Sequence, residues 1–171
     1  MDAYEPCPCG SGKKVKFCCA KDIAAELGKV MRSLEGEQRL AAVDQINQLL
    51  ASKGDLPCLL AVKGNTLLQL GELEKVRETI ERLFAVAAQN PVAFAQAAIL
   101  DSAEENELAA VAKLQSALTQ VGESMPLIVY EAIGAVAHSL IMGGNILAGR
   151  AHLVLQAALG GQEDTRAFSM L

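Results

Sequence analysis

Four of the five cysteines lie within thirteen positions of one another, as Cys7, Cys9, Cys18 and Cys19. In a reducing compartment such a dense cluster is more often a metal site than a pair of disulfides. Four thiolates complete a closed tetrahedral zinc site and leave no position for water. The spacing therefore predicts one structural Zn²⁺ bound by these four cysteines. Oxidised cysteine pairs, a redox-active cluster and a catalytic zinc are the alternatives.

The residues between the two cysteine pairs suit a tight metal-binding loop. Pro8 stiffens the first pair, and Gly10-Ser11-Gly12 allows the positive φ angles with which the backbone can turn back towards the second pair. Nearby positive charge lowers the pKa of thiols and favours metal loading. The basic residues of this segment are Lys13, Lys14, Lys16 and Lys21.

Residues 7–19 resemble the SEC-C motif, a zinc-binding segment of the bacterial translocase motor SecA and of small bacterial proteins. The match covers about 13 of 171 residues and includes the four cysteines, Pro8, the Gly-Ser-Gly turn, Lys13 and Phe17. The resemblance implies zinc binding. In the translocase motor the segment contacts an export chaperone and the ribosome, and it closes the chain, whereas here it opens it.

A second pattern organises the rest of the chain. Pro57, Pro91 and Pro126 fall 34 and 35 residues apart, which is the period of a helix-turn-helix solenoid. Each interval holds two apolar stretches with helical spacing, separated by a turn. We expect a zinc knuckle over residues 1–22 and a helical array over 23–171. Its expected parts are units at about 23–56, 57–90, 91–125 and 126–160, and a C-terminal helix over 161–171.

The second interval resembles the tetratricopeptide repeat family. Gly64, Leu67, Gly71, Val76 and Ile80 stand at that family's spacing, although the family's Trp and paired Tyr are missing. The expected fold is all-α: an α-α helical repeat solenoid of about three and a half to four helix pairs, preceded by a small zinc knuckle. A different α-α repeat and a plain helical bundle are the alternatives.

The expected function is binding, because nothing in the chain pairs a nucleophile with a general base and no phosphate-binding glycine loop precedes a helix. A solenoid usually binds its partner along the concave face. The residues predicted to contact a partner are Lys63, Asn65 and His138 on that face and Lys13, Lys14 and Lys16 on the knuckle. Cys58 is expected to be a small packed residue at a helix start. Loss of the metal is expected to disorder residues 1–21 and leave the helices largely intact.

Charge and composition narrow the class of partner. The net charge is −5 and 51% of the residues are hydrophobic, which argues against a nucleic-acid-binding domain as a whole and against a disordered chain. No secretion signal opens the chain and no stretch reaches about 20 apolar residues, so a cytoplasmic protein without membrane contact is expected. A basic knuckle on an acidic array suits two-point binding.

We therefore predict a non-enzymatic bacterial zinc-binding adaptor that binds a protein or peptide and no small-molecule substrate. The resemblance to the SEC-C motif directs the expected partners towards the ribosome or an export chaperone. Two alternatives belong to other classes: a zinc knuckle that binds RNA or the ribosome directly, and an enzyme accessory or metal-transfer protein.

Overall fold

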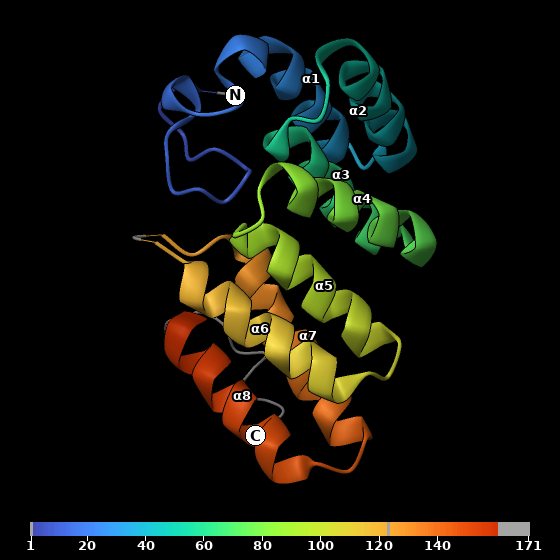
Figure 1. Ribbon diagram of the computed structural model, residues 1–171, viewed down its shortest axis with the longest axis vertical. Helices are drawn as coiled ribbons and strands as arrows, with labels where there is room; N and C mark the ends of the chain where they lie inside the picture. Colours follow the sequence, from blue (N-terminus) through green and yellow to red (C-terminus); the bar gives the residue numbers. More distant parts are fainter. Residues whose placement is uncertain (1, 123, 161–171) are drawn as a thin grey trace.

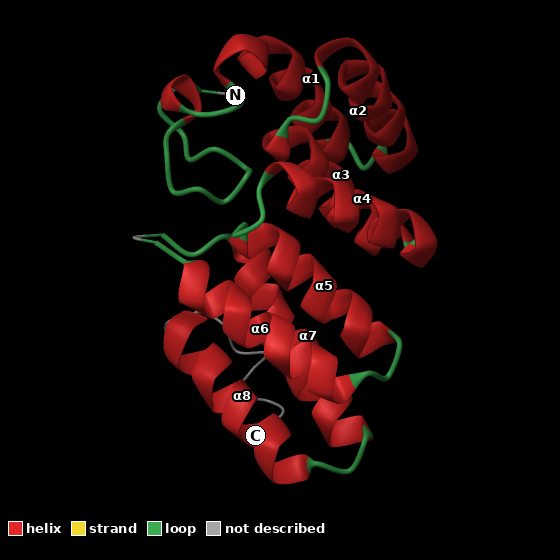
Figure 2. Ribbon diagram, viewed as in Figure 1, coloured by secondary structure: helices red, strands yellow, loops and turns green. Residues whose placement is uncertain are grey.

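The chain folds as a stack of α-helices (Figures 1 and 2). A computed structural model describes residues 2–122 and 124–160, and these form eight α-helices and no β-strand. Two short 3₁₀ helices, η1 (Val15–Phe17) and η2 (Lys21–Ile23), precede them. The α-helices are α1 (Ala24–Glu35), α2 (Arg39–Lys53), α3 (Pro57–Leu70), α4 (Leu73–Val86), α5 (Pro91–Ala103), α6 (Glu107–Gln120), α7 (Leu127–Met142) and α8 (Ile146–Gly160). The predicted all-α fold class is confirmed.

Consecutive helices form pairs, and the pairs follow one another along the long axis of the molecule (Figure 1). The turn inside each pair contains one residue in the left-handed region: Glu37 (φ 58°), Gly71 (φ 72°), Glu105 (φ 59°) and Gly144 (φ 87°). A left-handed residue is the usual way to end a helix sharply, and glycine adopts this conformation without steric cost. The same turn geometry thus recurs in every pair, as a helical repeat requires.

Proline and asparagine set where the first helices of the pairs begin. Pro57 and Pro91 occupy the first turn of α3 and α5, where a missing backbone N–H costs nothing. Asn90 caps α5, because its side chain accepts hydrogen bonds from the backbone N–H groups of Val92 (2.9 Å) and Ala93 (3.0 Å). Pro126 directly precedes α7. The proline period predicted from the sequence is therefore a period of helix starts.

The first helices α3, α5 and α7 form the interior of the stack. Helix α5 packs against both α3 and α7 as well as against its partner α6. Because neighbours cover it on several sides, most of its residues are buried, including four alanines. The second helix α4, by contrast, buries only one apolar stripe and exposes charged residues elsewhere. This division creates a main apolar cluster that extends from the N-terminal loop to α7 and a smaller one between α3, α4 and α5.

The predicted C-terminal helix over residues 161–171 lies outside the described residues. Among the helices that the structure describes, none has both the length and the apolar composition needed to cross a lipid bilayer.

Candidate metal centre

The N-terminal loop that carries the cysteines, residues 5–19, is called the knuckle here. Its two arms are joined by backbone hydrogen bonds from Cys7 N–H to the Lys13 carbonyl (2.8 Å) and from Val15 N–H to the Glu5 carbonyl (2.9 Å). The tip turns at Gly10 (φ 78°) and Gly12 (φ 73°), as the sequence predicted. The 3₁₀ helix η1 then returns the chain, so that the second cysteine pair meets the first.

The four knuckle thiols form a compact group. The Sγ atoms of Cys7, Cys9, Cys18 and Cys19 all lie within 4.8 Å of one another. The Cys7–Cys19 and Cys9–Cys18 sulfur pairs are 3.7 Å and 3.4 Å apart. Four sulfurs at about 2.3 Å from a tetrahedral ion are separated by about 3.8 Å. The cysteines that the spacing selected are therefore arranged so that they could hold a metal ion.

Burial differs between the two cysteine pairs. Cys7 and Cys9 are buried, whereas Cys18 and Cys19 are half-buried. The Cys18 thiol is also 3.1 Å from the hydroxyl of Ser11, which can donate a hydrogen bond to a thiolate. Cys18 is thus half-buried and has the hydroxyl of an exposed serine beside its sulfur.

The thiols influence one another's ionisation. The Cys19 thiol, whose sulfur is 3.7 Å from that of Cys7, holds the pKa of Cys7 far below its ordinary value. The pKa of Cys19 is raised, because the neighbouring thiols favour its protonated form. One thiolate therefore forms readily, and each further one is opposed by those beside it. A bound cation would remove this opposition, so metal binding is expected to release protons.

The knuckle is packed against the solenoid. The Asn90 amide that caps α5 also donates a buried hydrogen bond of 2.7 Å from Nδ2 to the Cys9 carbonyl. Gly10 approaches α5 and α7 so closely that a side chain there would meet Val92, Pro91 and Pro126. Cys7, Cys9 and Val15 belong to the same buried cluster as core residues of α3, α5 and α7. This packing couples the knuckle to the helices, whereas the sequence had led us to expect two independent parts.

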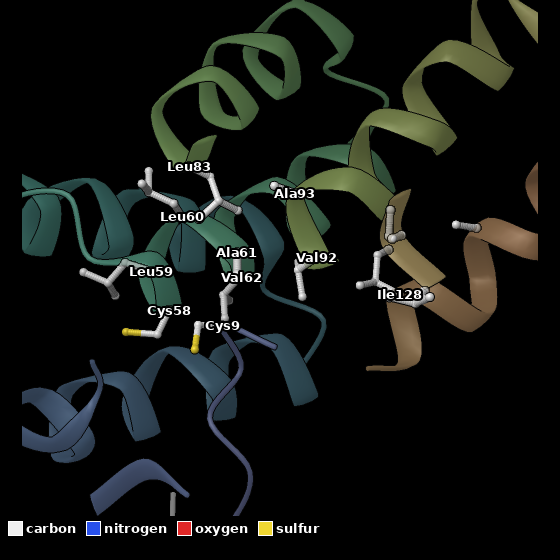
Figure 3. Packing of buried hydrophobic residues seen from close by; sticks show 14 of the residues in the cluster. Cys9, Cys58, Leu59, Leu60, Ala61, Val62, Leu83, Val92, Ala93 and Ile128 are labelled. Carbon is white, nitrogen blue, oxygen red and sulfur yellow. The ribbon is translucent and has the colours of Figure 1, made fainter. Parts of the chain in front are cut away.

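Cys58 lies in the core that the knuckle shares with the solenoid. It stands at the second position of α3, with none of its surface exposed, which agrees with the expected packed residue at a helix start. It belongs to the same buried cluster as Cys7 and Cys9. Figure 3 shows Cys58 close to Cys9 in the buried layer.

The predicted partner-contact lysines of the knuckle differ in accessibility. Lys13 and Lys14 are exposed. Lys16 is half-buried, and its ammonium group lies 3.7 Å from the centre of the Tyr4 ring and 4.6 Å from that of Phe17. Tyr4 and Phe17 are themselves 60% and 67% exposed. The outer side of the knuckle, together with the adjoining Tyr4, therefore combines positive charge with accessible aromatic rings.

The structure does not bring the three predicted solenoid residues together. Asn65 lines cavities beside the knuckle and along α7. The pKa of Lys63 is lowered by partial burial and by the charge of Arg82, a residue of α4, so this lysine lies on the α4 side of α3. His138 lines a separate cavity with Glu105 and Glu107 at the turn between α5 and α6. Lys63 and Asn65 lie on different sides of α3, because residues two positions apart on a helix do not share a face.

A groove runs from the knuckle along the first helices, and we call it the junction groove. It consists of two adjoining cavities of about 330 and 350 Å³ that share Asn65, Leu127 and Ile128. Gln96, which is fully buried, donates from Nε2 to the Ala61 carbonyl (2.8 Å) and to Oδ1 of Asn65 (2.5 Å). The hydrogen bond from Gln96 therefore fixes the orientation of the Asn65 amide. The knuckle wall of the groove is formed by Pro6, Cys7, Pro8, Gly10 and Gly12.

No protein-family model and no curated protein matches the chain. The fold and the site together define a helical repeat protein with an N-terminal cysteine cluster that could hold a metal ion. The residues of the cluster are Cys7, Cys9, Cys18 and Cys19.

Proposed function

We propose that the cluster binds one structural Zn²⁺ and that the protein is a non-enzymatic adaptor. Four sulfur ligands in a closed tetrahedral arrangement are typical of structural zinc, and the resemblance of residues 7–19 to the SEC-C motif supports the same metal. Because the knuckle forms one wall of the junction groove, the ion would fix the shape of that wall. The proposed role of zinc is thus to hold a binding surface, and the ion takes part in no reaction.

The junction groove is the observation that carries the adaptor proposal. Leu127 is 71% exposed at its centre, and Ile128 and Val92 provide an apolar floor. The Asn65 amide, which Gln96 orients, offers hydrogen bonds to a peptide backbone. An extended segment of a partner protein fits this combination of apolar floor and fixed amide better than a small polar metabolite does.

Charge suggests how the partner segment is oriented. Lys13 and Lys14 are exposed on the knuckle at one end of the groove, whereas Glu131 lines the cavity farther along α7. We propose a segment with acidic residues towards the knuckle and apolar residues over Leu127, which agrees with two-point binding. The SEC-C resemblance points towards a ribosomal protein or an export chaperone as its source.

The test is affinity capture from cell lysate with the full-length zinc-loaded protein and its Leu127→Arg variant. A charged side chain at the centre of the groove should remove the partner without harming the fold, because Leu127 is largely exposed. Leu108→Arg is the matched control, since Leu108 of α6 is 87% exposed and lies outside the groove. Retained proteins are identified by mass spectrometry, and their binding is then measured with purified components.

The proposal requires at least one protein that binds the intact chain and Leu108→Arg directly and is lost with Leu127→Arg. If the same proteins bind all three forms, the groove is not the partner site. If none binds the purified intact chain, the adaptor function itself fails.

Direct RNA binding by the knuckle is a second candidate, favoured by Tyr4 and Phe17 beside Lys14 and Lys16. Exposed aromatic rings can stack on bases while lysines contact phosphates. Binding to a single-stranded RNA should then fall steeply with salt and vanish when Lys13, Lys14 and Lys16 are changed to Glu. Salt-independent binding that survives these changes would eliminate this candidate.

A further inference from the structure

Glu131 places a negative charge in the junction groove. It lines the cavity of about 350 Å³ together with Asn65 and Leu127, and its side chain is accessible from the groove. None of the four ion pairs among the described residues includes Glu131. Partial burial by itself raises the pKa of Glu131 above its ordinary value. A cationic group of a bound partner would therefore gain a charge-assisted hydrogen bond at this position.

The other two polar residues of this cavity, Asn65 and Gln69, are already bonded on one side. Arg39 donates from Nε to Oε1 of Gln69 (3.1 Å), and Gln96 donates from Nε2 to Oδ1 of Asn65 (2.5 Å). The Nδ2 group of Asn65 lies on the other side of its amide and can donate to a backbone carbonyl of a bound segment. Because Asn65 lines both cavities of the groove, such a bond would fix the position of the segment along α7.

The spacing of residues along α7 matches that of an extended segment. Leu127 and Glu131 are four positions apart, so they lie on the same face of the helix and about 6 Å apart along its axis. In an extended chain, side chains that point to the same side recur every two residues, which is about 6.6 Å. A segment that runs along α7 with an apolar residue over Leu127 would therefore bring the residue two positions further on to Glu131.

We propose that Glu131 selects a basic residue of the partner segment, two positions beyond the apolar residue that covers Leu127. A lysine or arginine at this place would donate to the carboxylate, while acidic residues of the segment face Lys13 and Lys14 at the knuckle. The recognised segment thus has three parts in order: acidic, apolar and basic. The inference rests on the binding groove proposed above and adds the charge that distinguishes one apolar segment from another.

The test selects peptides on the full-length zinc-loaded protein from a phage-displayed library of random linear peptides. Peptides that also bind Leu127→Arg are removed, so that those bound in the groove remain. Peptides selected on the wild type should share a lysine or arginine two positions from an apolar residue. Glu131→Gln has the same shape without the charge, so peptides selected on this variant should keep the apolar residue and lose the basic one.

Affinity measurements with a synthetic peptide of the wild-type consensus then isolate the contact. Replacing its basic residue by glutamine should weaken binding to the wild type about tenfold, as expected for one charge-assisted hydrogen bond at a partly exposed site. The same replacement should leave binding to Glu131→Gln unchanged. Glu107→Gln is the matched control and should behave as the wild type, because Glu107 lines the separate cavity with His138.

Two results separate failure of this inference from failure of the groove. If the peptide replacement weakens binding to the wild type and to Glu131→Gln equally, or if the groove-bound peptides carry no basic residue at this spacing, the inference is overturned and the groove remains a binding site. If no selected peptide depends on Leu127, the groove is not a binding site, and the proposed function and this inference fail together.

Discussion

Asn90 joins the knuckle to the solenoid, and its replacement measures how strongly the two are coupled. Its Oδ1 accepts two hydrogen bonds that cap α5, and its Nδ2 donates the buried bond to the Cys9 carbonyl. Loss of a helix cap costs about 1 kcal/mol. Loss of the second bond costs about 1 kcal/mol and leaves a carbonyl without this donor, which adds about 1 kcal/mol more. Asn90→Ala should therefore lower the free energy of unfolding by about 3 kcal/mol.

Asn90→Ser separates the two contributions. Serine caps helices well, but its shorter side chain carries no amide that could reach the Cys9 carbonyl. The free energy of unfolding of this variant should fall by about 2 kcal/mol, which is the part that depends on the hydrogen bond to the Cys9 carbonyl. Asn106→Ala is the matched control, because Asn106 precedes α6 without a side-chain cap bond. A change of less than about 0.5 kcal/mol is expected there.

The assay is denaturant unfolding of the zinc-loaded proteins, followed by far-ultraviolet circular dichroism. For a chain of this size, about 3 kcal/mol corresponds to a fall in Tm of about 6–12 °C. If Asn90→Ser is as stable as the wild type and Asn90→Ala loses only about 1 kcal/mol, the bond to Cys9 contributes nothing. The conclusion that the knuckle is part of the solenoid core would then be refuted.

Three further predictions concern the metal, a turn and an ion pair. Removal of zinc with a chelator should lower the Tm of the helical signal, because the knuckle shares the core of α3 and α5; an unchanged Tm would favour an independent knuckle. Gly71→Val should cost at least about 1–2 kcal/mol, since Gly71 is left-handed (φ 72°), and should leave the zinc content at one equivalent; a loss of zinc would contradict this separation. Asp55→Asn should cost at most about 1 kcal/mol at neutral pH, since the pair with Arg82 is partly exposed. Hydrogen bonding to Arg82 lowers the pKa of Asp55 in the folded protein. The stabilisation by this ion pair is therefore present above the unfolded pKa of about 3.9 and is lost as the pH falls through the lower folded pKa. If the wild type is still more stable than Asp55→Asn at pH 2, the ion pair is not the source of the difference.

The features that the sequence alone determined are local. The cysteine spacing and the glycine turn of the knuckle predicted the grouped thiols, because ligands within thirteen positions can meet through a single loop. The positions of Pro57, Pro91 and Pro126 predicted helix starts, since proline acts on the backbone where it stands. The choice of Glu105 as a left-handed turn residue was not predicted, because glutamate has no preference for that conformation.

Only the tertiary structure decided how these local units are joined. Asn90 and Cys9 are 81 positions apart, so no spacing rule connects them. Their contacts depend on how the knuckle folds back over the starts of α3 and α5. Such packing depends on the shapes of several distant surfaces at once, whereas periodicity reports only which side of one helix is apolar. The shared core of knuckle and solenoid is therefore a property of the folded molecule.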